Sequence, residues 1–281
     1  MSGYGEAILV MLAINIVVAL AGYLPLAAGQ LNLGIAGFMA VGGYTSAYLT
    51  SAYHLPMGVG MAAGAAAAGL LGLLVAVPVL RTSGIYLALA TFALGQVIQA
   101  AFLNIEAVGA AAGYPVKPYA GFTVVLSVAF GVLVAVLLLS RTRFALLLTA
   151  TKNDPLVTEL FGVDVRAIRV AAFSLGALIA GIGGALYAHH YSYLEPQNFN
   201  IMLSVYIALY VLLGGTQTVA GPIVGAAFFT LLPELLRAGS HWRFVIFAVL
   251  IILVMAVRPE GLITGALARR LRFGKRREAA S

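Results

Sequence analysis

The sequence lacks cysteine and carries little charge. None of its 281 residues is cysteine, which excludes disulfides, thiolate metal sites and cysteine-based catalysis. Charged residues make up only 9% of the chain, against about 25% in a typical soluble domain. Hydrophobic residues make up 62%, more than a soluble globule of this length needs. The composition therefore predicts an integral membrane protein.

Charge is also scarce within the apolar segments. Ion-coupled carriers usually keep ionisable side chains there, but the centres of these segments have essentially none. The net charge of +7 comes from Lys and Arg near segment ends, the usual consequence of the positive-inside rule. We therefore expect contact with membrane lipid and no nucleic acid partner.

Motifs for energy conversion and catalysis are missing as well. Gly274 and Lys275 are followed by Arg276 and lack the upstream glycine of a P-loop. No nucleophile elbow or zinc-protease helix occurs within the spans, and the adjacent His189 and His190 have no neighbouring ligand set. The sequence predicts a solute pathway that is not an enzyme and holds no catalytic residue, cofactor or metal of its own.

A helix needs about 20 apolar residues to cross the hydrocarbon core, and nine apolar segments are candidate spans, of which the seventh, residues 201–213, is too short to span upright. We therefore predict an all-α, polytopic transmembrane helix bundle of about nine spans (range 8–10), forming a single domain over residues 1–281. Gly and Pro near residues 25–32 and 214–222 predict broken or re-entrant helices that line a pathway, with simple interfacial turns as the alternative. The segments are residues 7–24, 31–52, 57–80, 85–105, 122–139, 170–188, 201–213, 219–236 and 244–257.

The basic residues predict the orientation. Five of them lie between the fifth and sixth segments, and seven more lie in the basic tail, residues 258–281. Both regions should be cytoplasmic. Nine crossings then put the N-terminus and the loops at residues 106–119 and 191–200 outside.

Residues 151–169 form the one long polar segment, and its pattern predicts a short helix. Asn153 or Asp154 can cap it, Pro155 suits its first position and Gly162 suits its end. An amphipathic helix at this place can lie on lipid or insert into a groove of another protein. The acidic residues at 154, 159 and 164 favour the protein partner. The apolar face consists of Leu156, Val157, Leu160 and Phe161.

This segment and the helix at residues 172–187 resemble the coupling region of permease subunits from branched-chain amino acid ABC importers. Gly-Gln-Leu-Asn-Leu-Gly at residues 29–34 is similar to the family's Gly-Gln-Leu-Ser-Leu-Gly, with Asn32 where serine is usual, and points to one of its two permease types. Residues 81–91, 213–222 and 258–262 match three further landmarks in order.

The resemblance implies a type II ABC importer-like fold in a bacterial or archaeal cytoplasmic (inner) membrane. It implies a second permease, as a homologous heterodimer, two cytoplasmic ATPase subunits that bind ATP and Mg, and an extracytoplasmic substrate-binding protein. The expected solutes are branched-chain or related hydrophobic amino acids, with urea, amides or other small solutes as the alternative. The expected ATPase-coupling residues are Asp154, Leu156, Glu159, Leu160, Phe161 and Gly162.

Polar residues near the helix breaks are the predicted lining of the substrate pathway. Hydrogen bonding between helices is the alternative role for each. A carrier or channel that acts alone, and a membrane-embedded enzyme or scaffold, are the alternative functions. The exact solute, and whether two copies of this chain pair or one pairs with a different permease, are left open. The pathway candidates are Gln30, Asn32, Tyr44, Thr45, Thr91, Gln96, Tyr206 and Gln217.

Overall fold

The computed structural model describes residues 3–235, together with residues 246, 248, 249, 251–253, 256 and 261–263. The predicted ninth span and the basic tail therefore lie mostly outside the described residues. The helices of the described part are α1 Gly3–Ala27, α2 Ile35–Ser51, α3 Met57–Val79, α4 Ile85–Asn104, α5 Phe122–Leu139, α6 Arg143–Asn153, α7 Pro155–Leu160, α8 Val165–Tyr191, α9 Ile201–Gly214 and α10 Ala220–Leu235.

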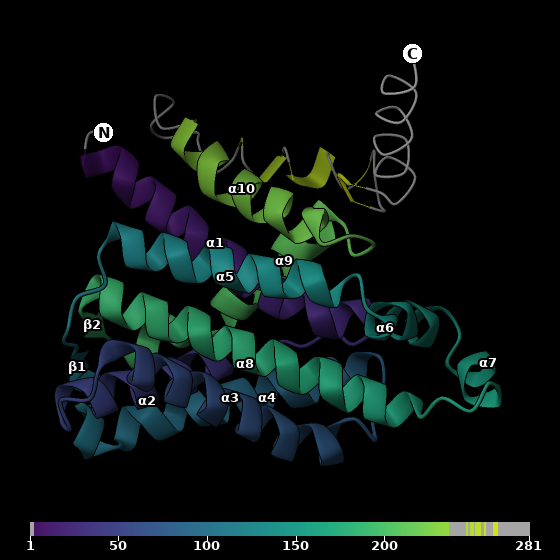
Figure 1. Cartoon of the computed structure of the whole chain (residues 1–281), viewed down its shortest axis with the longest axis horizontal. Coiled ribbons are helices and arrows are strands. Elements are labelled where there is room, and N and C mark those ends of the chain that lie inside the picture. Colours follow the sequence, from purple (N-terminus) through teal and green to yellow (C-terminus); the bar gives the residue numbers. More distant parts are fainter. Residues whose placement is uncertain are drawn as a thin grey trace.

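A bundle of long helices dominates the structure, in agreement with the all-α prediction (Figure 1). Among the described residues, α1, α3, α4, α5 and α8 are long and apolar enough to cross a membrane. Their Asp, Glu, Lys and Arg residues all lie within five residues of a helix start: Glu6 in α1, and Arg166 and Arg169 in α8. The helices α9 and α10 are apolar but shorter. The structure thus supports a multi-pass protein but does not confirm a count of nine spans.

The long helices divide into an inner and an outer set. In α1 and α8, 56% and 61% of the best apolar window is buried, against 28%, 28% and 22% in α3, α4 and α5. Since lipid tails are as apolar as leucine, an outer helix can expose an apolar surface without cost. We infer that α3, α4 and α5 face lipid, while α1 and α8 form the centre of the bundle.

Glycines hold α2, α3 and α8 in close contact. A Cβ at Gly42 would overlap the backbone of Gly181, and one at Gly184 would overlap the carbonyl oxygen of Met39. A Cβ at Gly64 would likewise overlap the Gly42 carbonyl. Small residues that let backbones meet are a common basis of helix association in membranes. These glycines of α2, α3 and α8 therefore serve helix packing.

The two ends of the bundle differ. At one end, β1 (Tyr114–Pro115) pairs with β2 (Tyr193–Leu194), so the loops at residues 106–119 and 191–200 meet, as expected if both lie on the same side. His189 ties this end together: its Nδ1 donates to the Pro118 carbonyl at 2.9 Å, which leaves Nε2 to accept from Ser46 Oγ at 2.9 Å. The opposite end carries α6 and α7 (Figure 1).

Two predicted boundaries need correction, and one helix was not predicted. The second segment was expected at residues 31–52, but α2 begins only at Ile35 because the preceding residues are not helical. The sixth segment was expected to begin at residue 170, but α8 begins at Val165, where Asp164 caps it by accepting from the Ala167 N–H at 2.9 Å. The helix α6 was not predicted, because its basic residues read as a loop.

Candidate functional site

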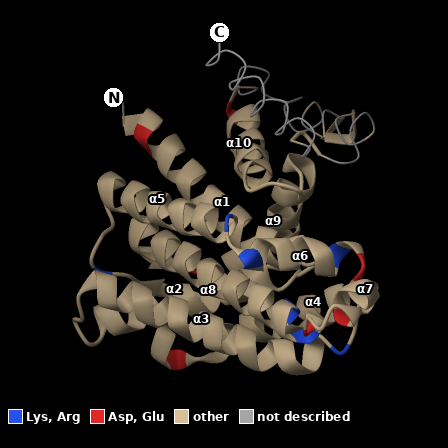
Figure 2. Cartoon of the chain, turned by 45° about the vertical axis from the view of Figure 1, so that its right-hand side comes forward, with Lys and Arg blue, Asp and Glu red and all other residues tan. Residues whose placement is uncertain are grey.

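Positive charge gathers at the end of the bundle that carries α6 and α7 (Figure 2). The segments that end or begin there hold all but one of the described Lys and Arg residues, the exception being Lys117 in the loop of the opposite end. The acidic residues Asp154, Glu159 and Asp164 lie in or beside α7. The short helix therefore presents carboxylates within a basic surface.

The helix α7 forms where the capping pattern predicts it. The Asp154 Oδ1 atom accepts from the Val157 N–H at 3.0 Å, and Pro155 occupies the first helical turn. This arrangement satisfies a backbone donor that the helix itself leaves unpaired. Gly162 ends the helix with a φ of +78°, in the left-handed region that favours glycine. Strong signals at both ends thus define a helix of only six residues.

The apolar residues of α7 point away from the rest of the chain. Leu156 is 74% exposed, Leu160 is 86% exposed and Phe161 is 83% exposed. Thr158 faces inward instead and donates from Oγ1 to the Asp154 carbonyl at 2.7 Å. Large apolar side chains on a charged, polar end of a protein are typical of a binding surface. We call Leu156, Val157, Leu160 and Phe161 the α7 face.

The first helix break, residues 28–34, joins α1 to α2. The Leu33 N–H donates to Thr91 Oγ1 at 3.0 Å, and the Gly34 N–H donates to Asn32 Oδ1 at 2.8 Å. Thr91 lies six residues into α4, about 9 Å from its start, so this irregular backbone lies inside the bundle. Both amide atoms of the buried Gln30 lack a hydrogen-bond partner within the described part of the chain. The break therefore brings three predicted pathway residues together.

The second helix break, residues 215–219, joins α9 to α10. Gly215 has a φ of +109°, and residues 261–263 return to this point, where the Leu262 N–H donates to the Leu213 carbonyl at 2.8 Å. Lys152, near the end of α6, donates from Nζ to Thr216 Oγ1 at 2.6 Å. Partial burial lowers the pKa of the Lys152 ammonium. The second break is thus held by two segments from elsewhere in the chain.

The other predicted pathway residues do not form one continuous surface with Gln30, Asn32 and Thr91. Tyr44 is buried and stacks on Phe102, with ring centroids 4.3 Å apart. Tyr206 is 42% exposed on α9. Thr45 and Gln96 are half-buried, and Gln217 is exposed. The role of these five residues in a pathway stays a prediction.

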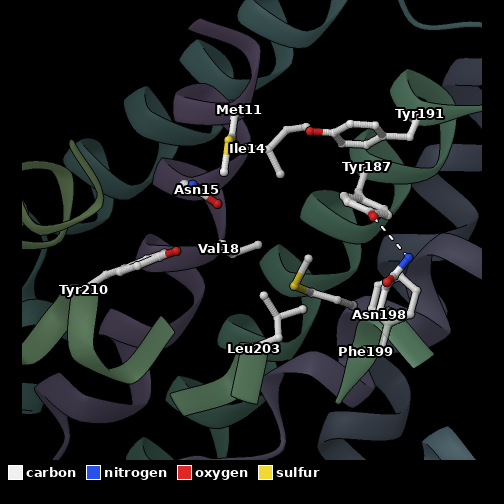
Figure 3. Close-up of a pocket in the computed structure, with 11 residues that line it drawn as sticks. Met11, Ile14, Asn15, Val18, Tyr187, Tyr191, Asn198, Phe199, Leu203 and Tyr210 are labelled. Atoms are coloured by element: carbon white, nitrogen blue, oxygen red, sulfur yellow. Dashed lines mark hydrogen bonds between the residues drawn. The ribbon is translucent and has the colours of Figure 1, made fainter. Parts of the chain in front are cut away.

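A cavity of about 250 Å³ lies between α1, α2, α8, α9 and the turn at residues 198–199 (Figure 3). None of the predicted pathway residues lines it. Sequence reasoning missed it because most of its lining consists of ordinary apolar residues, which look the same in a packed core. The lining residues are Met11, Ile14, Asn15, Val18, Met39, Tyr187, Tyr191, Asn198, Phe199, Leu203 and Tyr210.

A few polar groups face the cavity from different helices. Figure 3 shows Tyr191 and Tyr210 directing their hydroxyl groups inward from opposite sides. Asn198 donates to the Tyr187 hydroxyl at 3.4 Å, and Asn15 donates to Thr230 Oγ1 on α10 at 2.9 Å. A largely apolar wall with a few fixed polar groups is typical of a site for a small, partly apolar ligand.

Known proteins resemble the chain over most of its length. Residues 5–255 match the family described as branched-chain amino acid transport system, permease component. The chain is 28% identical over 292 residues to the high-affinity branched-chain amino acid transport system permease protein LivM of Escherichia coli (strain K12), covering 91% of this chain and 67% of that protein. It is 30% identical over 215 residues to the autoinducer 2 import system permease protein LsrC of Salmonella typhi, covering 74% of this chain and 57% of that protein. No solved structure matches it significantly.

Proposed function

The chain belongs to the family of branched-chain amino acid transport permeases, and we propose that it forms half of an import pathway for branched-chain or related hydrophobic amino acids. It is a multi-pass inner-membrane component of a transport system rather than an enzyme. Movement of its helices is driven by separate ATPase subunits, which bind ATP and Mg. A second, homologous permease completes the pathway, and an extracytoplasmic binding protein delivers the solute.

The observation that carries this proposal is the α7 face. Its three largest side chains are each more than 70% exposed at the basic end of the bundle, although burying a leucine or phenylalanine contributes about 1.5–3 kcal/mol. An amphipathic helix inserted into a groove of a partner gains that energy. Carboxylates at 154, 159 and 164 disfavour an anionic lipid surface as the partner. A cytoplasmic ATPase subunit fits both properties.

The same charge distribution supports the orientation. With the α7 end in the cytoplasm, α1 runs inward from an extracytoplasmic N-terminus, and the β1–β2 pair lies outside. The helices α2, α9 and α10 are then partial spans completed by the two helix breaks. Together with residues 244–257, they bring the proposed number of crossings to about nine.

The cavity suits the proposed solute. Apolar side chains such as Ile14, Val18 and Leu203 can contact a branched aliphatic side chain, while Tyr191 and Tyr210 offer hydroxyl groups to its polar end. Neutral dipoles can hold a zwitterion without a charged residue in the membrane. The cavity reaches the surface beside Met11, which is 49% exposed, so a second permease can complete its wall.

Filling the cavity should block transport. We expect Leu203→Trp to lower the uptake rate at least about tenfold, because the added ring occupies space that the solute needs, while ATP hydrolysis without solute continues. Met202→Trp is the matched control. Met202 is next to Leu203 on α9, but its side chain is 55% exposed and does not line the cavity. Equal uptake by the two variants in proteoliposomes would show that the solute does not pass through the cavity.

Co-purification tests the assembly. A tagged chain extracted in mild detergent should bring down an ATPase and a second permease, both identified by mass spectrometry, and the complex should hydrolyse ATP faster when loaded binding protein is added. A chain that purifies alone from cells expressing the whole system, and moves solute in that form, would point to a carrier or channel instead.

A further inference from the structure

The end of α6 lies beside both helix breaks. Lys152 donates from Nζ to Thr216 Oγ1 in the second break at 2.6 Å. At the first break, a Cβ added to Gly29 would lie 3.5 Å from the Lys152 Cα atom, so the two backbones run close together. Two irregular segments that are far apart in the sequence therefore share one neighbour.

Lys152 is firmly joined to α7. Asp154, two residues further on, ends α6 and caps α7 at the same time. Its N–H donates to the Ala150 carbonyl at 3.0 Å, and its Oδ1 atom accepts from the Val157 N–H at 3.0 Å. Because one residue is hydrogen-bonded into both helices, a displacement of α7 passes to the end of α6 instead of being absorbed by a loose linker.

Both breaks contain positions that suit a hinge. Gly29 has a φ of +77° and Gly215 has a φ of +109°, and glycine changes such backbone angles more easily than any other residue. Hinges consist of a few loop or element-terminal residues that absorb large φ and ψ changes. The backbone around the contacts of Lys152 can therefore move without unfolding the long helices.

The hydrogen bond itself can be exchanged. It joins an ammonium group to the neutral Thr216 hydroxyl, and the net contribution of one such hydrogen bond is modest because water can take the place of either partner. Lys152 is also exposed over part of its surface, so water can replace the hydroxyl when the two segments separate. The contact is strong enough to transmit a small displacement and weak enough to break during a transport cycle.

We propose that Lys152 is a positioning residue that carries the movement of α7 to the second helix break through Thr216, and to the first through the close approach of its backbone to Gly29. The inference rests on the proposed function, since it requires an ATPase that moves α7. It adds a defined connection between the α7 face and the two helix breaks within this chain.

Uptake per ATP tests this role in the assembled importer. Lys152→Met keeps the length of the side chain and removes its donor, and Thr216→Val removes the acceptor. Each should lower solute transported per ATP by about tenfold, the equivalent of one such hydrogen bond, and the double variant should be no worse than either single one because both break the same contact. Unchanged uptake per ATP in Lys152→Met would overturn the proposal.

Two controls match these changes. Thr149→Val alters a threonine of the same helix whose hydroxyl donates only to its own helix, at Ala145. Lys117→Met removes an exposed lysine at the other end of the bundle. Both should keep wild-type uptake per ATP, and a loss as large as that of Lys152→Met would show a general effect and contradict the role of Lys152.

A labelling experiment separates transmission from simple stabilisation. The chain has no cysteine, so Thr218→Cys places a single thiol in the second break. Its rate of reaction with a water-soluble maleimide should differ between the nucleotide-free and ATP-bound importer, and adding Lys152→Met should abolish that difference. A difference that persists with Lys152→Met would overturn the role of Lys152 alone. Absence of ATP-driven uptake by the unmodified importer would overturn the proposed function, and this inference with it.

Discussion

Replacing Leu160 and Phe161 together by aspartate should abolish solute-stimulated ATP hydrolysis by the assembled importer. Both side chains are more than 80% exposed on the α7 face, and in the proposed complex they fill a groove of the ATPase subunit. Central apolar contacts of this kind cost about 2 kcal/mol or more each when truncated, and a buried, unpaired carboxylate costs further. We expect a loss of ATPase affinity of about a thousandfold, measured by co-purification and by the ATPase rate.

The control for this variant is Leu146→Asp. Leu146 is 73% exposed on α6, so the same chemical change is made at the same end of the bundle but outside the α7 face. This control should keep the ATPase subunits bound. If instead Leu160→Asp with Phe161→Asp co-purifies with a full complement of ATPase and shows wild-type stimulation, α7 is not the docking element.

Gly184→Ala should strongly destabilise the folded chain. The new Cβ would overlap the Met39 carbonyl oxygen, a backbone atom that can move only if α2 and α8 separate. Overpacking commonly costs about 1–3 kcal/mol and occasionally more, and here the separation also disturbs the neighbouring contact of Gly42 with Gly181. We expect the apparent melting temperature in detergent to fall by about 5 °C or more.

The matched change is Gly131→Ala in α5. A Cβ at Gly131 meets no described atom within 4 Å, and alanine is a better helix former than glycine, so this variant should melt at or slightly above the wild-type temperature. Equal melting temperatures for the two variants would mean that α2 and α8 do not pack through their glycines.

Much of the fold follows from local signals. The four apolar segments that became α1, α3, α4 and α5 were predicted because length and hydropathy are sufficient to identify a span. The α7 helix was predicted from Asp154, Pro155 and Gly162, each of which acts within one turn. The α6 helix was missed because Arg143 and Lys152 lower its hydropathy, and its stability comes from packing against α8 and α1, which no local pattern encodes.

The candidate site was only partly predictable. Gln30, Asn32 and Thr91 were singled out as polar residues near breaks, and the structure brings them to one irregular segment. The cavity could not be predicted, because Met11 and Leu203 differ from core residues only in the space beside them. The contact of Lys152 with Thr216 depends on tertiary structure, so no local sequence pattern predicts it.

The central claim is that this chain forms a pathway without an energy source of its own. The most direct test is the uptake of radiolabelled leucine into proteoliposomes that contain the assembled importer, its binding protein and ATP. The account predicts that leucine accumulates only when ATP is hydrolysed, and that the purified chain alone neither accumulates nor equilibrates it. Leucine movement by the chain alone, at the rate of the full complex and without ATP, would contradict it.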